Sequence, residues 1–164
     1  MHKTERILAI TALVTAAAVM APGTAISDSR CYRHGPGERR MVRKINRARV
    51  RVGKGRIHRD PELSRVAAAH SRTMAENNRL FHTPSRRLAR RVTRWNRLGE
   101  NVAYGQRVGG MHRRFMRSAA HKANILGAYP HVGVAISRSH GRRWVTVVFE
   151  ARRDPGTRMD MPTC

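Results

Sequence analysis

The spacing of apolar residues changes once along this chain, and that change limits the folds available to it. The first part contains four segments with apolar residues three or four positions apart, the spacing of one helix face. These segments begin near Glu38, Asp60, Ser85 and Val108. Residues 132–149 instead alternate apolar with small or polar residues around a turn, which predicts a β-hairpin with one strand buried on both faces. Helices followed by a hairpin predict an α+β fold with layers of helix on sheet.

Individual residues indicate where these helices begin and end. Asp60-Pro61-Glu62 combines an N-cap side chain, a first-turn proline and an acid near the positive end of the helix dipole. We expect this second helix to run to about Arg79 and the first helix to end at Gly53. Residues 99–105 are expected to be loop or strand. The third helical stripe consists of Leu88, Ala89, Val92 and Trp95.

The N-terminus has the pattern of an export signal. A short basic start precedes the uncharged apolar run 7–20, and small residues follow it up to Ala25. This run falls short of the ~20 residues that a membrane-spanning helix needs, so we predict a cleaved signal peptide over residues 1–25. The alternative is an uncleaved anchor. We divide the remainder into a flexible leader (26–37), one folded domain (38–151) and a C-terminal tail (152–164), and expect a secreted monomer without a later transmembrane segment.

The two cysteines, Cys31 and Cys164, lie at opposite ends of the mature chain. In an oxidising compartment, a disulfide between them would tie both ends to the body of the protein. Two unpaired surface thiols are the alternative. Export favours the disulfide.

The chain is strongly basic, with 34 Lys and Arg residues against 10 Asp and Glu, a formal net charge of +24. Such a surface attracts polyanions, among them anionic lipid headgroups and acidic cell-wall polymers. The basic residues occur in every segment, and the chain lacks an aromatic-rich strand of the kind that stacks on bases. We therefore expect polyanion attraction but no specific nucleic-acid partner.

Three polar residues stand where packing alone would not require them: His82, Glu100 and His121. A carboxylate between two imidazoles can orient the rings and set their tautomers. The same three groups could instead bind one divalent metal through two nitrogens and one oxygen. A third reading is a buried hydrogen-bonded network that fixes the shape of a cleft. Asn101 and Asn124 are predicted to support this region, Asn101 by holding local backbone and Asn124 by capping the turn after His121.

The other histidines carry no evident partner in the sequence. His70 lies on the apolar stripe of the second predicted helix and is read as a core histidine with a satisfied hydrogen bond. The remaining ones are predicted to lie at the surface. They are His34, His58, His112, His131 and His140.

Several of these pieces, taken in order, resemble the motifs of the CAP family (cysteine-rich secretory, antigen 5 and pathogenesis-related-1 proteins) in its compact bacterial form. The matching motifs are His82, Gly99-Glu100-Asn101-Val102-Ala103, Ser118-x-x-His121-x-x-Asn124-Ile125-Leu126, Gly133-Val134-Ala135 and Trp144-x-x-x-x-Phe149. The resemblance covers roughly residues 40–150. It implies a three-layer α-β-α sandwich that ends in a β-hairpin.

In that family a central cleft lined by two histidines and acidic partners can hold zinc or another divalent metal. By position, the resemblance implies His82, His121 and Glu100 as the metal ligands here. The sequence departs from the animal and plant pattern at Ser118, where a glutamate can stand. Ser118 is therefore assigned a supporting role in the cleft, and the four-residue set is incomplete.

Two functions follow as hypotheses. The first is a secreted, non-catalytic binding module that acts at the cell envelope, on anionic lipid or wall polymers. The alternative is a metal-dependent hydrolase of peptide, wall or ester bonds that uses the same cleft. No serine or cysteine stands in the context of a nucleophile, which favours the first hypothesis.

Overall fold

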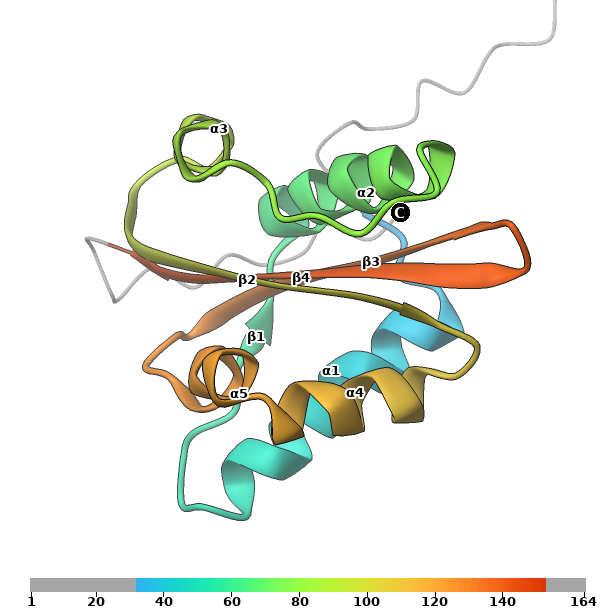
Figure 1. Cartoon of the computed structure of the whole chain (residues 1–164). Coiled ribbons are helices and arrows are strands. Elements are labelled where there is room, and N and C mark those ends of the chain that lie inside the picture. Colours follow the sequence, from blue (N-terminus) through green and yellow to red (C-terminus); the bar gives the residue numbers. More distant parts are fainter. Residues whose placement is uncertain (1–31, 153–164) are drawn as a thin grey trace, which may run out of the picture.

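The computed structural model describes residues 32–152, which form three layers around one sheet (Figure 1). The sheet has four strands in the order β1-β3-β4-β2. Their bounds are β1 His58–Arg59, β2 Trp95–Gly105, β3 His131–Ser139 and β4 Arg142–Arg152. The helices are α1 Pro36–Val50, α2 Pro61–Glu76, α3 Ser85–Arg91, α4 Val108–Arg117 and α5 Ala119–Leu126. Within these residues no helix is both long and apolar enough to cross a membrane.

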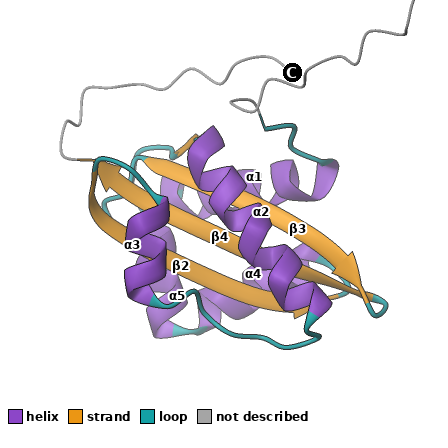
Figure 2. Ribbon diagram, turned by 90° about the horizontal axis from the view of Figure 1, so that it is seen from above, coloured by secondary structure: helices purple, strands orange, loops and turns teal. Residues whose placement is uncertain are grey.

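The helices cover both faces of the sheet. α2 and α3 form the upper layer in Figure 1, and α1, α4 and α5 form the lower layer. Seen from above, α2 lies over β3 and β4, and α3 lies beside β2 (Figure 2). This arrangement confirms the predicted α-β-α sandwich. The predicted signal peptide and both cysteines lie outside the described residues.

Two helix starts follow from their caps. α1 begins at Pro36, two residues before the predicted start, because proline fits the first turn and Glu38 accepts a hydrogen bond from the Gly35 amide. α2 begins after Asp60, whose carboxylate accepts a hydrogen bond from the Leu63 amide at 3.0 Å. The prediction for α2 was right at this end. The helix stops at Glu76 rather than near Arg79, since Asn78 adopts the left-handed conformation with φ 46°.

Two other predictions were wrong in detail. The third helical stripe ends at Arg91, because Arg94 turns the chain with φ 54° and Trp95 already belongs to β2. The turn expected after His121 belongs to the helix α5.

The central strand of the sheet is β4, which pairs antiparallel with both β2 and β3. The predicted hairpin is confirmed: its turn places His140 at φ 51° and Gly141 at φ 64°, as tight hairpin turns require. Residues 144–150 of β4 are all buried, because helices cover both faces.

Close contact between α2 and β3 depends on Gly133. A Cβ atom at this position would lie 2.1 Å from the backbone carbon of Leu63, so no side chain fits there without moving the helix. Leu63 and Ala67 then pack with Val148 in the upper part of the core. The lower part of the core includes Met41 and Phe115.

Arg49 is a buried arginine on α1, whereas Arg40, Arg43 and Arg47 of the same helix are exposed. The Arg49 guanidinium donates hydrogen bonds to the carbonyls of Gly55, Ile125 and Gly127 at 2.7–2.9 Å. These three bonds satisfy a charged group that burial would otherwise destabilise. They also join the end of α1 to the end of α5.

Candidate functional site

The three residues singled out in the sequence meet at the free edge of β2. Within the described part of the chain, β2 pairs with β4 alone. Glu100 lies on β2, His82 lies in the loop between α2 and α3, and His121 lies on α5. The edge of β2 thus forms the floor of a cleft between the upper and lower helix layers.

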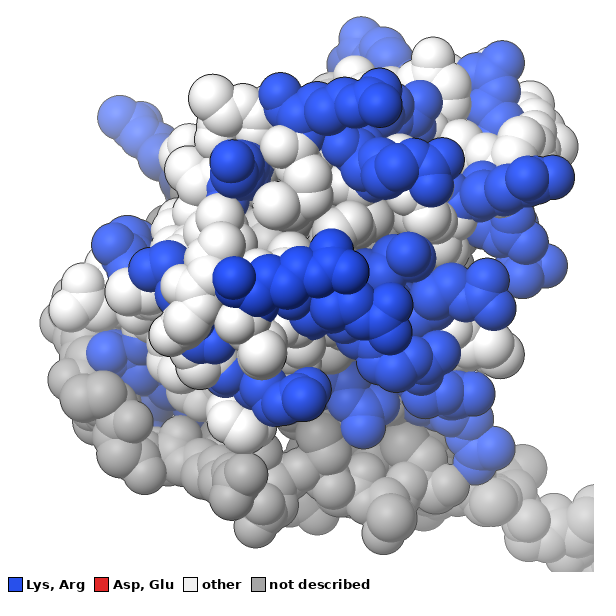
Figure 3. Space-filling model, turned by 90° about the horizontal axis from the view of Figure 1, so that it is seen from below, with Lys and Arg blue, Asp and Glu red and all other residues white. Residues whose placement is uncertain are grey.

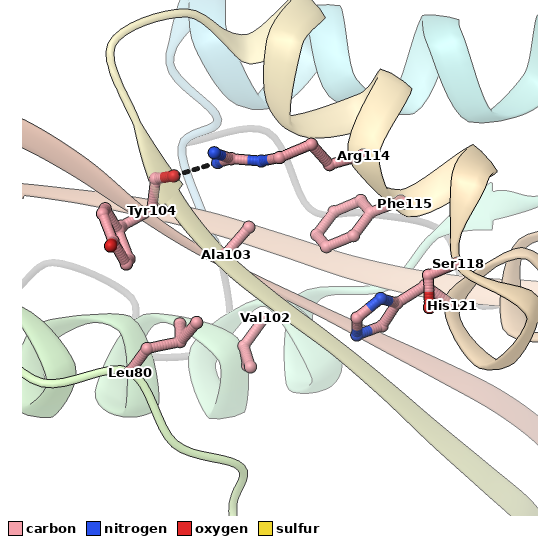
Figure 4. A pocket seen from close by; sticks show the side chains of 8 residues that line it. All are labelled: Leu80, Val102, Ala103, Tyr104, Arg114, Phe115, Ser118 and His121. Atoms are coloured by element: carbon pink, nitrogen blue, oxygen red, sulfur yellow. Dashed lines mark hydrogen bonds between the residues drawn. The ribbon is translucent and has the colours of Figure 1, made fainter.

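Side chains from the lower layer donate hydrogen bonds to backbone carbonyls on the outer side of this edge strand. Tyr129 Oη donates to the Leu98 carbonyl at 3.3 Å, and Asn124 Nδ2 donates to the Glu100 carbonyl at 3.2 Å. A further bond joins the Arg114 guanidinium to the carbonyl of Tyr104 (Figure 4). An edge strand covered in this way is protected from pairing with another strand.

The carboxylate of Glu100 accepts three hydrogen bonds. His82 Nδ1 lies 2.9 Å from Oε1, the Thr83 amide donates to the same oxygen at 2.8 Å, and Thr83 Oγ1 donates to Oε2 at 2.6 Å. The Glu100 side chain is only 5% exposed, whereas that of His82 is 56% exposed. Glu100 therefore fixes the loop that carries His82 and directs Nε2 of that ring away from the carboxylate.

The two histidine rings stack across the cleft. The centroids of His82 and His121 are 6.2 Å apart with an interplanar angle of 27°, and Phe115 packs against His121 at 5.2 Å. Burial lowers the pKa of His121, and the neighbouring His82 lowers it further. The His121 ring is therefore favoured in its neutral form.

The supporting residues hold α5 against β2. Asn101 Nδ2 donates to the backbone carbonyl of His121 at 2.9 Å, and Asn124 Nδ2 lies 2.8 Å from Asn101 Oδ1. Asn124 thus bridges to β2, where the sequence suggested a local turn cap. Ser118 is the N-cap residue of α5, and its side chain lines the cleft. This arrangement positions the ring of His121.

Two hollows flank the histidine pair. The first has a volume of about 340 Å³ and is mainly apolar. Figure 4 shows the side chains that line it: Leu80, Val102, Ala103, Tyr104, Arg114, Phe115, Ser118 and His121. The second, of about 530 Å³, lies on the other side and includes His82, Glu100 and Trp95. Both volumes fall in the size range of small-ligand sites.

The residues as they stand do not fit a metal site with three protein ligands. Such a site would need an oxygen of Glu100, and both oxygens already accept hydrogen bonds from His82 or Thr83. Over residues 32–152, no group of three or more His, Cys, Asp or Glu side chains is placed to hold a metal ion. The two imidazoles remain as ligands for an ion, and metal binding stays a prediction.

A second candidate site is the lower face of the molecule, formed by α1, α4, α5 and the turn after α1. Figure 3 shows many Lys and Arg side chains gathered on this face, with no acidic side chain in view. The segments 39–59 and 101–149 contain no Asp or Glu at all, and Glu38 of α1 is buried. The exposed cations of the lower face are Arg40, Arg43, Arg47, Arg51, Lys54, Arg56, Arg113, Arg117 and Lys122.

Sequence reasoning missed a buried ionic cluster at the opposite end of the sheet from the hairpin. Arg152 donates to Asp60 Oδ2 at 2.6 Å and to Glu150 Oε2 at 3.0 Å, and His131 Nδ1 lies 3.7 Å from the same Glu150 oxygen. Burial raises the pKa of Glu150 and lowers that of His131. No local pattern indicates this cluster, because its members come from three different segments.

The prediction of surface positions was wrong for two histidines. His34 is 4% exposed and His131 is 5% exposed. His34 packs on Tyr32 and forms a hydrogen bond with Ser64 Oγ at 3.1 Å, whereas β3 carries His131 into the ionic cluster. His70 is buried as predicted, with Nε2 2.8 Å from the Phe81 carbonyl.

Comparisons with known proteins agree with the fold and the motifs. The model of the family described as "CAP: Cysteine-rich secretory protein family" matches residues 42–149. The membrane protein YlbC of Bacillus subtilis (strain 168) is 28% identical over 111 residues, which are 63% of this chain and 32% of that protein. The matched region thus spans about a third of this curated relative.

Solved structures show the same fold at low identity. An outer surface protein from Borrelia burgdorferi superposes with a TM-score of 0.67 and 17% identity, covering 75% of this chain and 98% of that one. An extracellular protein of Bacillus anthracis that contains an SCP domain gives a TM-score of 0.63 at 22% identity, covering 71% of this chain and 40% of that one.

Proposed function

This chain belongs to the CAP, or cysteine-rich secretory protein, family, and on that premise we propose that it is a secreted binding module that attaches to anionic surfaces of the cell envelope. The attachment surface is the lower face, and its partners are anionic lipid headgroups or acidic wall polymers. The cleft with His82 and Glu100 serves mainly to hold the β2 edge, the following loop and α5 together.

The observation that carries this proposal is the lack of acidic side chains among the exposed cations of the lower face, as far as the structure describes it. A net charge of +24 alone would favour any polyanion. On the lower face, however, exposed cations lie side by side with no acidic side chain among them (Figure 3). Neighbouring carboxylates would neutralise such a surface, and their absence leaves a continuous positive potential for a flat anionic partner.

The descriptions of similar proteins support an envelope location. The Borrelia structure is described as an outer surface protein, the Bacillus anthracis structure as an extracellular protein and the Bacillus subtilis relative as a membrane protein. Together with the N-terminal signal pattern, these descriptions support export of this chain.

Binding assays over a range of salt concentrations test the proposal. At about 0.05 M salt, the native protein should sediment with phosphatidylglycerol vesicles or with purified cell-wall material. As the salt concentration rises towards ~1 M, screening becomes strong and the protein should be released. His82→Ala should bind as the native protein does, since His82 lies outside the lower face. Binding that does not change with ionic strength, or no binding to either material, would contradict the proposal.

A metal-dependent hydrolase acting on peptide, wall or ester bonds is the second candidate function. The stacked pair His82 and His121 beside two hollows favours it, because two oriented imidazoles can hold a divalent ion. Metal analysis of protein purified without added metal tests this candidate. If this candidate is right, the native protein carries one divalent ion per chain. The ion is lost from His82→Ala and from His121→Ala, and it is kept in the exposed control His140→Ala. A metal-free native protein counts against it.

A further inference from the structure

The turn between α1 and β1 carries exposed apolar side chains within the basic lower face. Val50, the last residue of α1, is 50% exposed, and Val52 is 54% exposed. These are the two largest exposed fractions among the large hydrophobic residues described. A single exposed valine is ordinary on a protein surface. Here two exposed valines stand two positions apart, between exposed cations. Such a surface matches a partner that is both apolar and anionic.

The exposed charged residues next to these valines in the sequence are all basic. Arg47, Arg51, Lys54 and Arg56 are all exposed on the same turn or on the last turn of α1. Segment 39–59 contains no acid, so no carboxylate of this segment offsets their charge. Alternation of apolar and basic side chains is typical of surfaces that rest in the headgroup region of a bilayer, where apolar groups reach the acyl boundary and cations meet lipid phosphates.

The backbone holds this turn in one conformation. The carbonyl of Arg49 accepts hydrogen bonds from the amides of Val52 and Lys54, both at 3.0 Å. Gly53 closes the turn with φ 70°, and its amide donates to the Val50 carbonyl at 3.1 Å. Because the guanidinium of Arg49 is anchored inside the protein, the turn is fixed from within and presents Val50 and Val52 outward.

The position of this turn on the molecule also favours contact with a flat surface. In Figure 1 the C-terminal end of α1 lies farther from the sheet than any other part of the lower layer. Figure 3 views the molecule from this side and shows many Lys and Arg side chains on the lower face. A flat surface that approaches the lower face would therefore meet this turn first.

We infer that the α1–β1 turn is a membrane anchor, in which Val50 and Val52 enter the interface of an anionic lipid bilayer while the surrounding cations bind lipid phosphates. The inference rests on the proposed function and selects lipid over wall polymer as the partner of the lower face. An acidic polymer would engage the cations but would offer no apolar layer for the valines.

The test compares two substitutions on three probes. The first variant is Val50→Ser/Val52→Ser, and its control is Leu80→Ser, which removes an exposed apolar side chain from the loop between α2 and α3, outside the lower face. The probes are phosphatidylglycerol vesicles, phosphatidylcholine vesicles and soluble poly(glycerol phosphate). Each variant is first shown to keep the native melting transition, as expected for exposed positions.

We expect Val50→Ser/Val52→Ser to weaken binding to phosphatidylglycerol vesicles about tenfold, with unchanged affinity for poly(glycerol phosphate). The control variant should bind phosphatidylglycerol vesicles and poly(glycerol phosphate) as the native protein does. Equal vesicle affinity of native protein and valine variant would overturn the anchor while leaving the proposed function intact. Tighter native binding to the polymer than to the vesicles would overturn lipid as the partner. Failure of the native protein to bind any anionic probe would overturn the proposed function itself.

Discussion

The guanidinium of Arg152 lies 2.6 Å from the carboxylate of Asp60, although 92 positions separate the two residues. Both side chains are buried. Asp60 is also the N-cap of α2, so a single carboxylate both starts this helix and holds the last residue of β4. The ion pair thereby joins the beginning of the upper layer to the end of the central strand.

Removal of the Arg152 charge should therefore destabilise the fold strongly. Arg152→Met leaves Asp60 and Glu150 buried without their cation, and loss of one partner of a buried pair costs about 3–5 kcal/mol. Urea unfolding measures the change. The control is Arg138→Met on the exposed part of β3, which should change the unfolding free energy by less than ~0.5 kcal/mol. Equal stability of the two variants would show that the pair does not hold the fold.

The second prediction concerns the hydrogen bonds that Thr83 and His82 form with the carboxylate of Glu100. Glu100→Ala removes the acceptor of the buried Thr83 amide and hydroxyl, which should lower the unfolding free energy by roughly 1–3 kcal/mol. The exposed acid Glu76 gives the matched control Glu76→Ala, with little expected effect. Chemical denaturation followed by far-UV circular dichroism measures both. A stable Glu100→Ala variant would contradict the structural role assigned to the carboxylate.

Stability should fall in mild acid. Burial, aided by Arg59 near His34 and by Lys44 near His112, lowers the pKa of both histidines to about 4. Because the folded pKa lies below the unfolded value of about 6.5, their contribution is complete above pH 6.5 and is lost as the pH falls towards 4. Burial raises the pKa of Glu150, which acts in the opposite direction and offsets part of this loss.

Between pH 7 and pH 5 we expect the native protein to lose on the order of 2–4 kcal/mol of unfolding free energy. Denaturant titrations at the two pH values measure this loss. The His34→Gln/His112→Gln variant should lose clearly less over the same interval. A native protein that gains stability between pH 7 and pH 5 would contradict the assignment of buried His34 and partly buried His112 as neutral groups.

The contact between Gly133 and α2 gives a prediction about packing. Gly133→Ala would place a methyl group 2.1 Å from the backbone of Leu63, so α2 must move away from β3 at an expected cost of about 3 kcal/mol or more. Gly55→Ala is the control, because nothing lies within 4 Å of its Cβ position. Thermal melts compare the two variants. Equal melting temperatures would show that the sheet and helix are less tightly packed than described.

Much of the fold could be predicted because the signals were local. The cap at Asp60 and the hairpin turn at Gly141 depend on neighbouring residues alone, and the structure has both. The segment Ala119–Leu126 was missed as a helix because it is short and buries only Ile125 completely, which leaves no clear apolar stripe.

The candidate site, too, was predicted only in part from the sequence. His82, Glu100 and His121 were placed in one cleft from the order of their motifs, and the structure brings them together. The sequence could not show that Thr83 also donates hydrogen bonds to the Glu100 carboxylate, because a threonine next to a histidine forms no recognisable sequence motif. Burial of Arg49 likewise depends on carbonyls that lie 76 and 78 positions away along the chain.

The central claim is that the lower face carries the attachment, and two triple variants with equal loss of charge test it most directly. Arg40, Arg43 and Arg47 form an exposed stripe on α1, whereas Arg87, Arg90 and Arg91 are exposed on α3 in the upper layer. Each set is replaced by glutamine, and affinity for the anionic probe that the native protein binds best is measured at about 0.1 M salt. At about 1 kcal/mol per cation, the α1 variant should lose on the order of a hundredfold in affinity and the α3 variant less than about tenfold. Equal losses in the two variants would mean that net charge, and not this face, produces the binding.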